Sequence, residues 1–488
     1  MSNCLTADTS HAVPITPISK SSLPQWIKSH PAQREWLNLT GFKAEPGSFT
    51  FLPGSKGDPA RVLATRDEGE PLWAFAGLPT TLPEGVYSID SDLDSAQATA
   101  AALGWSLGSY AFTKYKSPKR ASAVLVWPKH ADQSDVERVS QGVFRARDLI
   151  NTPTEDMGPD ELIEAGAEIA KHAGAKVRIL RGDALLAQNY PTIHAVGRAS
   201  TRAPGLLDFT WGDKNAPKVT LVGKGVCFDT GGLNIKPREG MLQMKKDMGG
   251  AAIVLGLAQA LMAANTPIRL RVLVPAVENS IAGNAIRPLD IIRTRTGKTV
   301  EIGNTDAEGR LILCDALAEA DSEQPELLID CATLTGAARI ALGPEVQAFF
   351  CDDDDVALSL QETGATFSDP IWRLPIWRSY RKLIEGKCAD LNNVAPNPFA
   401  GSIIAALYLA EFVSAATAWA HFDVMASNPT AQPGRPEGGE ATGLRALYYY
   451  IRRRYQTKNL PHAATPASVR NSRAQPQRVP RRSRGSGR

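Results

Sequence analysis

Apolar and polar positions alternate along the chain in a way that predicts two folded parts. In the first part, short runs of strand-forming residues surround one alanine-rich run with helical spacing. They predict strands at residues 49–52, 72–75 and 123–127 and a helix at 95–107. We therefore expect a flexible N-terminus over the polar, proline-containing residues 1–20, followed by a smaller N-terminal α/β domain over 21–140.

Strand and helix patterns alternate regularly in the second part. Strands are predicted at 177–180, 192–196, 219–222, 270–274 and 327–330, and helices at 134–149, 158–173, 248–263 and 310–320. This alternation is typical of an α/β domain with a mixed, largely parallel sheet flanked by helices. We assign residues 145–455 to this larger C-terminal domain.

Charge separates the folded part from the end of the chain. Residues 456–488 contain eight Lys and Arg residues, no acid and few large apolar residues, so we expect a disordered basic tail. Taking those eight charges from the formal net charge of +3 leaves −5 for residues 1–455.

The cysteines and apolar runs bear on the cellular compartment. The six cysteines contain no CxxC pair, which favours reduced thiols over a disulfide framework. Cys227, Cys314 and Cys331 are interpreted as small core residues. The N-terminus has no secretory signal, and the apolar runs at 251–264 and 400–413 are too short or interrupted to span a bilayer. We therefore expect a cytoplasmic protein that does not engage a membrane.

Four carboxylates, two lysines and one arginine gather near the predicted strand ends. They are Lys224, Asp229, Lys236, Asp247, Asp306, Glu308 and Arg310. Loops at the carboxyl ends of strands form the ligand crevice of open α/β sheets, so these side chains are predicted to meet. Four converging carboxylates need compensating charge, which two divalent cations would supply. Such a pair would also activate water and polarise a carbonyl group, with a lysine as a further ligand.

Each segment taken alone has a simpler interpretation. Asp247 is also a candidate helix N-cap, and Asp306 with Glu308 is a candidate capping arrangement for the following helix. The sequence around Lys224 lacks the spacing of a phosphate-binding loop. His421 is interpreted as a packed, hydrogen-bonded core residue. The chain contains no His-Glu-x-x-His motif of the helical zinc peptidases.

Taken together, these segments resemble the leucyl aminopeptidase (cytosol aminopeptidase) family of dinuclear metallopeptidases. The octapeptide at 304–311 is similar to the family signature, and the spacing from Lys224 to Asp247 matches as well. Further similar segments lie at 332–336 and 389–393. The resemblance covers about 145–450, whereas residues 1–140 carry no motif of the family.

The resemblance implies roles for individual residues. Asp229 and Glu308 would bridge two metals, Lys224 and Asp247 would complete one site, and Asp306 would complete the other. The non-ligand catalytic cations would be Lys236, which polarises the scissile carbonyl, and Arg310, which orients a bicarbonate or water. The pocket for the N-terminal side chain would contain Met244, Thr333, Leu334 and Gly336, and its methionine favours leucine-like side chains.

The resemblance also implies an activity, cofactors and an assembly. We expect a metal-dependent aminopeptidase that releases N-terminal residues from peptides, with two Zn²⁺ or Mn²⁺ ions per subunit, a metal-activated hydroxide and a homo-hexameric state. Two other functions stay open. The basic tail would allow a secondary DNA-binding or regulatory role, and the carboxylates alone would suit a two-metal phosphoesterase.

Overall fold

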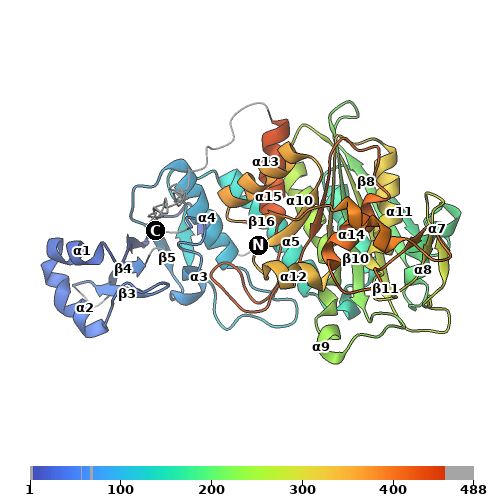
Figure 1. The fold of residues 1–488 in the computed structure, drawn as a ribbon. Helices are drawn as coiled ribbons and strands as arrows, with labels where there is room; N and C mark the ends of the chain where they lie inside the picture. The colour runs from blue at the N-terminus through green and yellow to red at the C-terminus, as the bar shows by residue number, and fades with distance from the viewer. Residues whose placement is uncertain (1–3, 56–57, 66–69, 457–488) are drawn as a thin grey trace, which may run out of the picture.

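The computed structural model describes residues 4–55, 58–65 and 70–456. A smaller N-terminal part and a larger C-terminal part lie side by side, as Figure 1 shows. The first contains a six-stranded sheet and the second a nine-stranded sheet. The chain is thus α/β in both parts. Apart from Gln456, the predicted disordered tail lies outside the described residues.

The N-terminal sheet has the strand order β1-β6-β5-β2-β4-β3. Its strands are β1 (Leu5–Thr6), β2 (Val13–Ile18), β3 (Phe49–Pro53), β4 (Pro59–Thr65), β5 (Val86–Ile89) and β6 (Val124–Val126), and its helices are α1 (Leu23–Ser29), η1 (Pro31–Gln33), α2 (Arg34–Thr40), α3 (Leu78–Thr81) and α4 (Ser95–Gly108). All neighbouring strands are parallel except the β3–β4 pair. The predicted strands at 49–52 and 123–127 and the helix at 95–107 are confirmed.

The predicted flexible N-terminus over residues 1–20 is wrong for the residues that the structure describes. β1 pairs with β6, and β2 lies inside the sheet between β5 and β4. The prolines of β2 concealed this strand. Val13–Ile15 pair with β5 and Ile15–Ile18 pair with β4, so Pro14 and Pro17 each face only one paired neighbour. Each proline therefore has a side on which no ladder hydrogen bond is required.

Two further predicted strands are wrong. Residues 72–75 form turns that lead into α3, and residues 192–196 lie in a helix, α8 (Pro191–Gly197). Short apolar runs do not distinguish a buried strand from a buried helix. At α8 the decisive residue is Pro191, whose fixed φ angle suits the first turn of a helix.

The larger sheet is mixed, with four parallel strands at its centre. The order along the sheet is β16-β15-β18-β14-β9-β11-β8-β7, and β10 pairs with β11. The strands are β7 (Lys176–Arg181), β8 (Gly205–Trp211), β9 (Lys218–Gly223), β10 (Gly225–Asp229), β11 (Arg269–Asn279), β14 (Leu327–Ala332), β15 (Gln347–Cys351), β16 (Ile371–Arg373) and β18 (Trp419–Asp423). β18, β14, β9 and β11 are mutually parallel, whereas β8, β7 and β15 join antiparallel partners.

Helices cover both faces of this sheet and enclose two apolar cores. One core includes side chains of α5, α6, α10 and α15, and the other includes side chains of α8, α11 and α14. The helices are α5 (Gln133–Asn151), α6 (Pro159–His172), α7 (Ala184–Ala187), α9 (Arg238–Met241), α10 (Gly249–Ala263), α11 (Gly309–Ser322), α12 (Gly336–Leu342), α13 (Asp354–Thr366), α14 (Gly401–Ala410) and α15 (Leu444–Tyr455), with short 3₁₀ turns η2 (Thr154–Asp156), η3 (Met244–Met248) and η4 (Arg378–Ile384). The helices predicted in this part are confirmed.

Helix α5 joins the two parts of the chain. It packs against α4 of the N-terminal part and against α10 of the larger part. Glycines permit the close contact with α10, because a Cβ atom on Gly142 would lie 2.7 Å from the carbonyl oxygen of Gly256. The predicted boundary between residues 140 and 145 therefore falls inside this helix.

Short strands complete the larger part. β12 (Ile291–Arg293), β13 (Thr299–Glu301) and β17 (Leu391–Asn392) form one small sheet, and β19 (Ser427–Asn428) and β20 (Gly438–Gly439) form another. Among the described residues, no helix has the length and apolar character needed to cross a bilayer.

Candidate active site

The predicted site residues meet at the carboxyl ends of the parallel strands. β9 and β10 run in succession along β11, and the chain leaves the ladder between them at Lys224. The backbone N–H of Lys224 instead donates to the carbonyl of Cys331 on β14, 3.0 Å away. Asp229 is the last residue of β10. The break in the strand thus directs the Lys224 side chain into the crevice beside β14.

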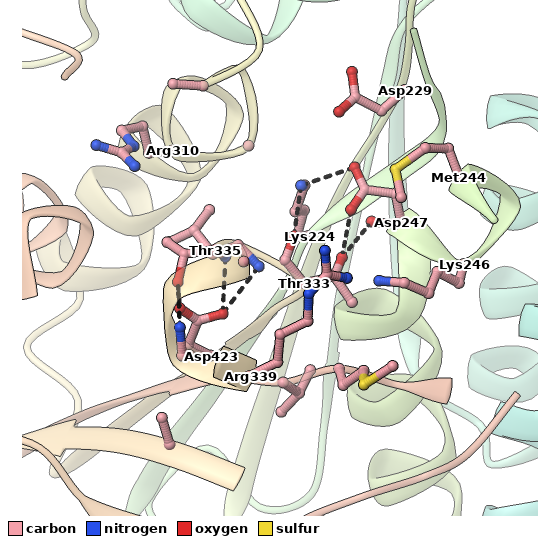
Figure 2. Close-up of a pocket in the computed structure, with 18 of the residues that line it drawn as sticks. Lys224, Asp229, Met244, Lys246, Asp247, Arg310, Thr333, Thr335, Arg339 and Asp423 are labelled. Carbon is pink, nitrogen blue, oxygen red and sulfur yellow. Dashed lines mark hydrogen bonds and ion pairs between the residues drawn. The ribbon is translucent and has the colours of Figure 1, made fainter. Parts of the chain in front are cut away.

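The other charged residues reach the same crevice from neighbouring segments. Asp247 lies in η3, just before α10, and Lys236 lies in the loop after β10. Asp306 and Glu308 precede α11, and Arg310 lies in its first turn. All seven charged residues predicted for the site line one cavity. Figure 2 shows several of them, with the amine of Lys224 directed at the Asp247 carboxylate.

Each lysine lies between two carboxylates. The Lys224 Nζ atom is 2.8 Å from Asp247 Oδ2 and 3.1 Å from Glu308 Oε1, and it also donates to the carbonyl of Thr333 at 2.8 Å. The Lys236 Nζ atom is 2.7 Å from Asp229 Oδ2 and 2.5 Å from Asp306 Oδ1. Two cations therefore compensate four carboxylates in this structure.

The donor set suits divalent metal ions. Carboxylate oxygens of Asp229, Asp306 and Glu308 lie within 4.8 Å of one another. The Glu308 Oε2 atom is buried and has no hydrogen-bond partner among the described residues. An unsatisfied buried carboxylate oxygen beside two further carboxylates is a strong reason to expect a bound cation, because buried acceptors are otherwise almost always paired.

Burial and mutual repulsion shift the ionisation of these groups. Burial, followed by repulsion from Asp247, raises the pKa of Asp229 to about 6. Burial and the charge of Asp229 raise the pKa of Glu308 to about 7. Burial alone would lower the pKa of Lys224, but the Asp247 and Glu308 carboxylates outweigh it and raise that pKa. The carboxylates thus need a stronger positive field than the lysines provide to stay fully ionised at neutral pH.

Asn279, at the end of β11, holds the cluster together and was not predicted from the sequence. Its side-chain amide donates to Asp229 Oδ1 at 2.8 Å and to the carbonyl of Thr305 at 3.1 Å. It therefore ties one proposed bridging carboxylate to the loop that carries Asp306 and Glu308. Asn279 could have been identified from the sequence by its position at the carboxyl end of a parallel strand.

Arg310 occupies a different side of the cavity. Its guanidinium is buried and donates to the carbonyl of Asn393 at 2.7 Å. Its Nε atom has no hydrogen-bond partner among the described residues. Burial lowers the pKa of Arg310, as expected for a cation without a nearby counter-ion. Figure 2 shows Arg310 on the opposite side of the cavity from Asp247 and Lys246.

The residues predicted to receive the substrate side chain line the same cavity. They are Met244, Thr333, Leu334 and Gly336. Thr333 connects these four residues to the metal-binding carboxylates, because its hydroxyl donates to Asp247 Oδ1 at 2.8 Å. Asp423 fixes the loop by accepting from the backbone N–H groups of Leu334 and Thr335, at 3.1 and 3.0 Å.

The cavity residues that sequence reasoning missed include Lys246, Arg339 and Met425. Two of them lie next to or near predicted site residues, but their spacing gave no indication of which side chains face the cavity. The neighbouring Lys245 points elsewhere and donates to the carbonyl of Asn151.

The structure decides among the simpler interpretations. The N-cap positions of α10 and α11 are held by Met248 and Glu308, and neither helix has a side-chain cap hydrogen bond. The carboxylates of Asp247, Asp306 and Glu308 therefore do not cap these helices. His421 is fully buried with its Nδ1 atom 2.6 Å from Asp330 Oδ1, which confirms a packed core residue. Cys227, Cys314 and Cys331 are buried free thiols, as predicted.

Comparison with known families assigns both parts of the chain. The model of the cytosol aminopeptidase family catalytic domain matches residues 144–448. The model of the M17 aminopeptidase N-terminal domain matches residues 13–128. The chain belongs to the cytosol aminopeptidase family. The N-terminal domain of the family is thus present, although the sequence there contains no motif that we recognised.

Relatives and solved structures agree with this assignment. A probable cytosol aminopeptidase of Geotalea uraniireducens is 38% identical over 393 residues, which are 76% of this chain and 79% of the relative. A peptidase B of Pectobacterium carotovorum is 40% identical over 358 residues, 70% of this chain and 82% of the relative. The crystal structure of a cytosol aminopeptidase from Coxiella burnetii superposes with a TM-score of 0.89 at 46% identity, covering 93% of this chain and all of that one.

A second structural neighbour was solved with a metal. The bottromycin maturation enzyme BotP in complex with Mn has a TM-score of 0.79 and 30% identity, and the match covers 92% of this chain and all of BotP. This chain is therefore a metal-dependent aminopeptidase, a hydrolase that acts on peptides. The comparisons give no support to a phosphoesterase or to a DNA-binding role.

Proposed function

We propose that this aminopeptidase releases N-terminal residues from short peptides with two divalent metal ions held between β10, η3 and the loop before α11. The observation that carries the proposal is the pairing of Lys224 and Lys236 with four converging carboxylates. The two ammonium groups lie where positive charge is needed, between the carboxylates.

The ligands follow from this arrangement. Asp229 and Glu308 would bridge the metals, Lys224 and Asp247 would complete one site, and Asp306 would complete the other. The orphaned Glu308 Oε2 atom supports a bridging role, because it leaves one oxygen free while Oε1 faces Lys224. Bound dications would neutralise the carboxylates, polarise the substrate carbonyl and lower the pKa of water. Oxygen-rich ligands suit Mn²⁺, and Zn²⁺ is the second candidate.

Lys236 is suited to act on the reacting carbonyl group. Its side chain comes from a loop and is 15% exposed, whereas that of Lys224 is 3% exposed and enclosed by three acceptors. Lys236 is therefore free to turn from Asp229 and Asp306 toward the substrate oxygen. There its ammonium would stabilise the negative charge that develops as the peptide bond breaks.

Arg310 is suited to hold an anion or water beside the reacting groups. Its buried guanidinium has an unpaired Nε donor and no ion-pair partner among the described residues. A bicarbonate ion would satisfy both the charge and the donor. Held there, bicarbonate or water would carry a proton from the attacking water to the departing amine.

The remaining features of the proposal concern selectivity and assembly. The methionine side chain of Met244 gives the pocket an apolar wall, so leucine-like N-terminal residues should be accepted within a broad range. The homo-hexamer and the cytoplasmic location are carried over from the family resemblance and from the names of the relatives.

A metal-restoration assay tests this function. The protein is stripped with a chelator and its hydrolysis of leucine anilide is followed as Mn²⁺ or Zn²⁺ is returned, with a phosphate ester as the parallel substrate. We expect activity on the anilide to disappear and return with about two metal ions per chain, and none on the ester. Full activity in the stripped protein, or saturation at one ion, would contradict the two-metal site.

A further inference from the structure

The loop that carries two of the proposed metal ligands lacks regular secondary structure. It links β13, which ends at Glu301, to α11, which begins at Gly309, and its Asp306 and Glu308 line the cavity. No strand ladder or helix therefore fixes the backbone of residues 303–307. Several of its N–H and C=O groups are bound by side chains from other segments instead. The positions of both carboxylates thus depend on those side chains.

Asn393 binds this loop at both ends. Its Oδ1 atom accepts from the N–H groups of Gly303 and Asn304, at 2.8 and 3.2 Å. Its Nδ2 atom donates to the carbonyls of Asn304 and Ala307, at 2.7 and 3.3 Å. The backbone carbonyl of Asn393 accepts from Arg310 Nη1 at 2.7 Å. Four residues between 303 and 310 thus contact one asparagine, which is fully buried.

The position of Asn393 is set outside the cavity. Asn393 follows β17, which pairs with β13 in the small sheet, and its N–H donates to the carbonyl of Glu301 at 3.1 Å. The Glu301 carboxylate in turn accepts from the N–H groups of Lys387 and Cys388, both at 3.1 Å. Asn393 does not line the cavity, so it does not reach a substrate or metal bound there. It therefore provides a fixed point for the loop from behind the reacting groups.

An asparagine suits this position because its amide donates and accepts at once without a net charge. Burial and repulsion among the carboxylates already raise the pKa of Asp229 and Glu308. A negatively charged side chain would add to that repulsion, and a positively charged one would compete with metal. The same choice recurs at Thr305, whose N–H donates to Asn234 Oδ1 at 2.9 Å and whose carbonyl accepts from Asn279 Nδ2 at 3.1 Å. Neutral amides thus hold the loop beside the charged groups.

We propose that Asn393 is a positioning residue that holds the metal-binding loop and Arg310 in a fixed relation. Its side chain sets where Asp306 and Glu308 meet the ions, and its carbonyl sets where the guanidinium lies relative to them. The ion completed by Asp306 depends strongly on Asn393, because two of its ligands lie on this loop. The other ion keeps its ligands from the β9–β10 break and from η3. This inference rests on the proposed two-metal site.

A competition titration of the full chain with a chromophoric chelator and Mn²⁺ tests this role, because it measures both metal affinities in the folded protein. Asn393→Ala removes the four side-chain hydrogen bonds to the loop. We expect affinity for one ion to fall by at least about tenfold, the effect of one or two lost hydrogen bonds, and affinity for the other much less. The double variant with Lys224→Met should lose affinity for both ions, which assigns the two losses to different ions.

Asn393→Asp gives a sharper comparison because it keeps the shape and the acceptor of the side chain. Its donor is replaced by an oxygen that faces the carbonyls of Asn304 and Ala307. The added negative charge would by itself strengthen metal binding, so a fall of about tenfold or more identifies the lost donor as the cause. Asn392→Asp is the matched control, because it adds the same charge one residue away and can still accept from the Val394 N–H, 3.1 Å from Oδ1. Its metal affinities should equal or exceed those of the wild type.

The link to Arg310 is tested by a double-mutant cycle on kcat at saturating metal, with leucine anilide as the substrate. The factor by which Asn393→Ala lowers kcat should be about threefold or more smaller in an Arg310→Met background, because both changes affect the same guanidinium. Asn279 contacts the same loop but not Arg310, so the losses from Asn279→Ala and Arg310→Met should multiply. Losses that also multiply for Asn393→Ala would remove Arg310 from the proposal.

Thermal unfolding of each metal-free variant separates positioning from general destabilisation. Asn428→Ala is the control, because this amide makes two hydrogen bonds outside the cavity, to the Pro436 carbonyl and to Glu440 Oε2. It should lower the unfolding temperature without changing metal affinity. A metal-loaded wild type that fails to hydrolyse leucine anilide would overturn the proposed function itself. An active wild type, with both affinities unchanged or equally lowered in Asn393→Ala and Asn393→Asp, would overturn the positioning role alone.

Discussion

Replacing each site lysine by methionine should change metal affinity in opposite directions. Lys224→Met and Lys236→Met remove one positive charge each and keep a similar side-chain length. If both lysines only balanced charge, both variants would bind metal more tightly, because a competing ammonium is gone. We expect this for Lys236→Met. In Lys224→Met a ligand is lost, so affinity for one of the two ions should fall by at least about tenfold, or about 1.4 kcal/mol.

The structure also sets the expected changes in stability and in kcat of the two lysine variants. Lys224 lies between Asp247 and Glu308 with almost no exposure, so its removal leaves two buried carboxylates without a counter-ion. Breaking a buried pair in this way costs about 3–5 kcal/mol, so metal-free Lys224→Met should unfold more readily than metal-free wild type. Lys236 is more exposed and its loss should cost less stability. Its catalytic effect should be larger, a fall in kcat of roughly 10²–10³ at saturating metal, as for the loss of one oxyanion donor.

Competition with a chromophoric chelator gives the affinities, and leucine anilide at saturating metal gives kcat. Lys245→Met serves as the control for removal of a partly buried lysine outside the cavity. Equal changes of affinity in the two variants would refute the different roles of the two lysines. Tighter binding in Lys224→Met would show that this amine is a counter-ion and not a ligand.

Four further predictions come from the same contacts. Asp229→Asn and Glu308→Gln should each lower both bound metal, measured by elemental analysis, and kcat; unchanged metal content would remove them as bridges. The raised pKa values of Asp229 and Glu308, about 6 and 7, mean that protons compete with metal, so the half-saturating metal concentration should rise as pH falls from 7 to 6. For the metal-free protein, the free energy of unfolding should fall as pH rises from about 4 to 7. The raised pKa values mean that the folded state binds more protons than the unfolded state over this range. Asn279→Ala should cost about 1–3 kcal/mol in denaturant unfolding, since it leaves the Thr305 carbonyl unpaired, and it should lower kcat/KM.

The central sheet and the charged cluster were predictable because local signals agreed with the fold. Apolar strands ending in loops with charged side chains, as at Val219–Val222, implied a parallel sheet with its crevice at the strand ends. The seven charged residues then needed only that topology to converge. The interpretation of the four carboxylates as a metal site came from residue type, because oxygen donors without histidine indicate hard cations.

The failures have identifiable physical causes. β2 was missed because its prolines are normally excluded from a sheet interior, and only the staggered pairing with β5 and β4 accommodates them. The helix at α8 was taken for a strand because its apolar run was short. Lys246 and Arg339 were missed because the direction of a side chain in a 3₁₀ turn or a short helix depends on packing against segments far away in the sequence.

The choice of lysine rather than histidine in this site follows from its charge. A neutral histidine in place of Lys224 would leave Asp247 and Glu308 uncompensated before metal binds, and their repulsion would oppose folding of the crevice. Lys224 and Lys236 hold the carboxylates together, each by contacting two of them. The same pairing makes metal entry depend on the lysines. Lys224 is enclosed and has no alternative position, so it must lose its proton or remain a competing cation, whereas Lys236 can turn away. That difference in enclosure is the structural basis for assigning one lysine to the metal and the other to the substrate.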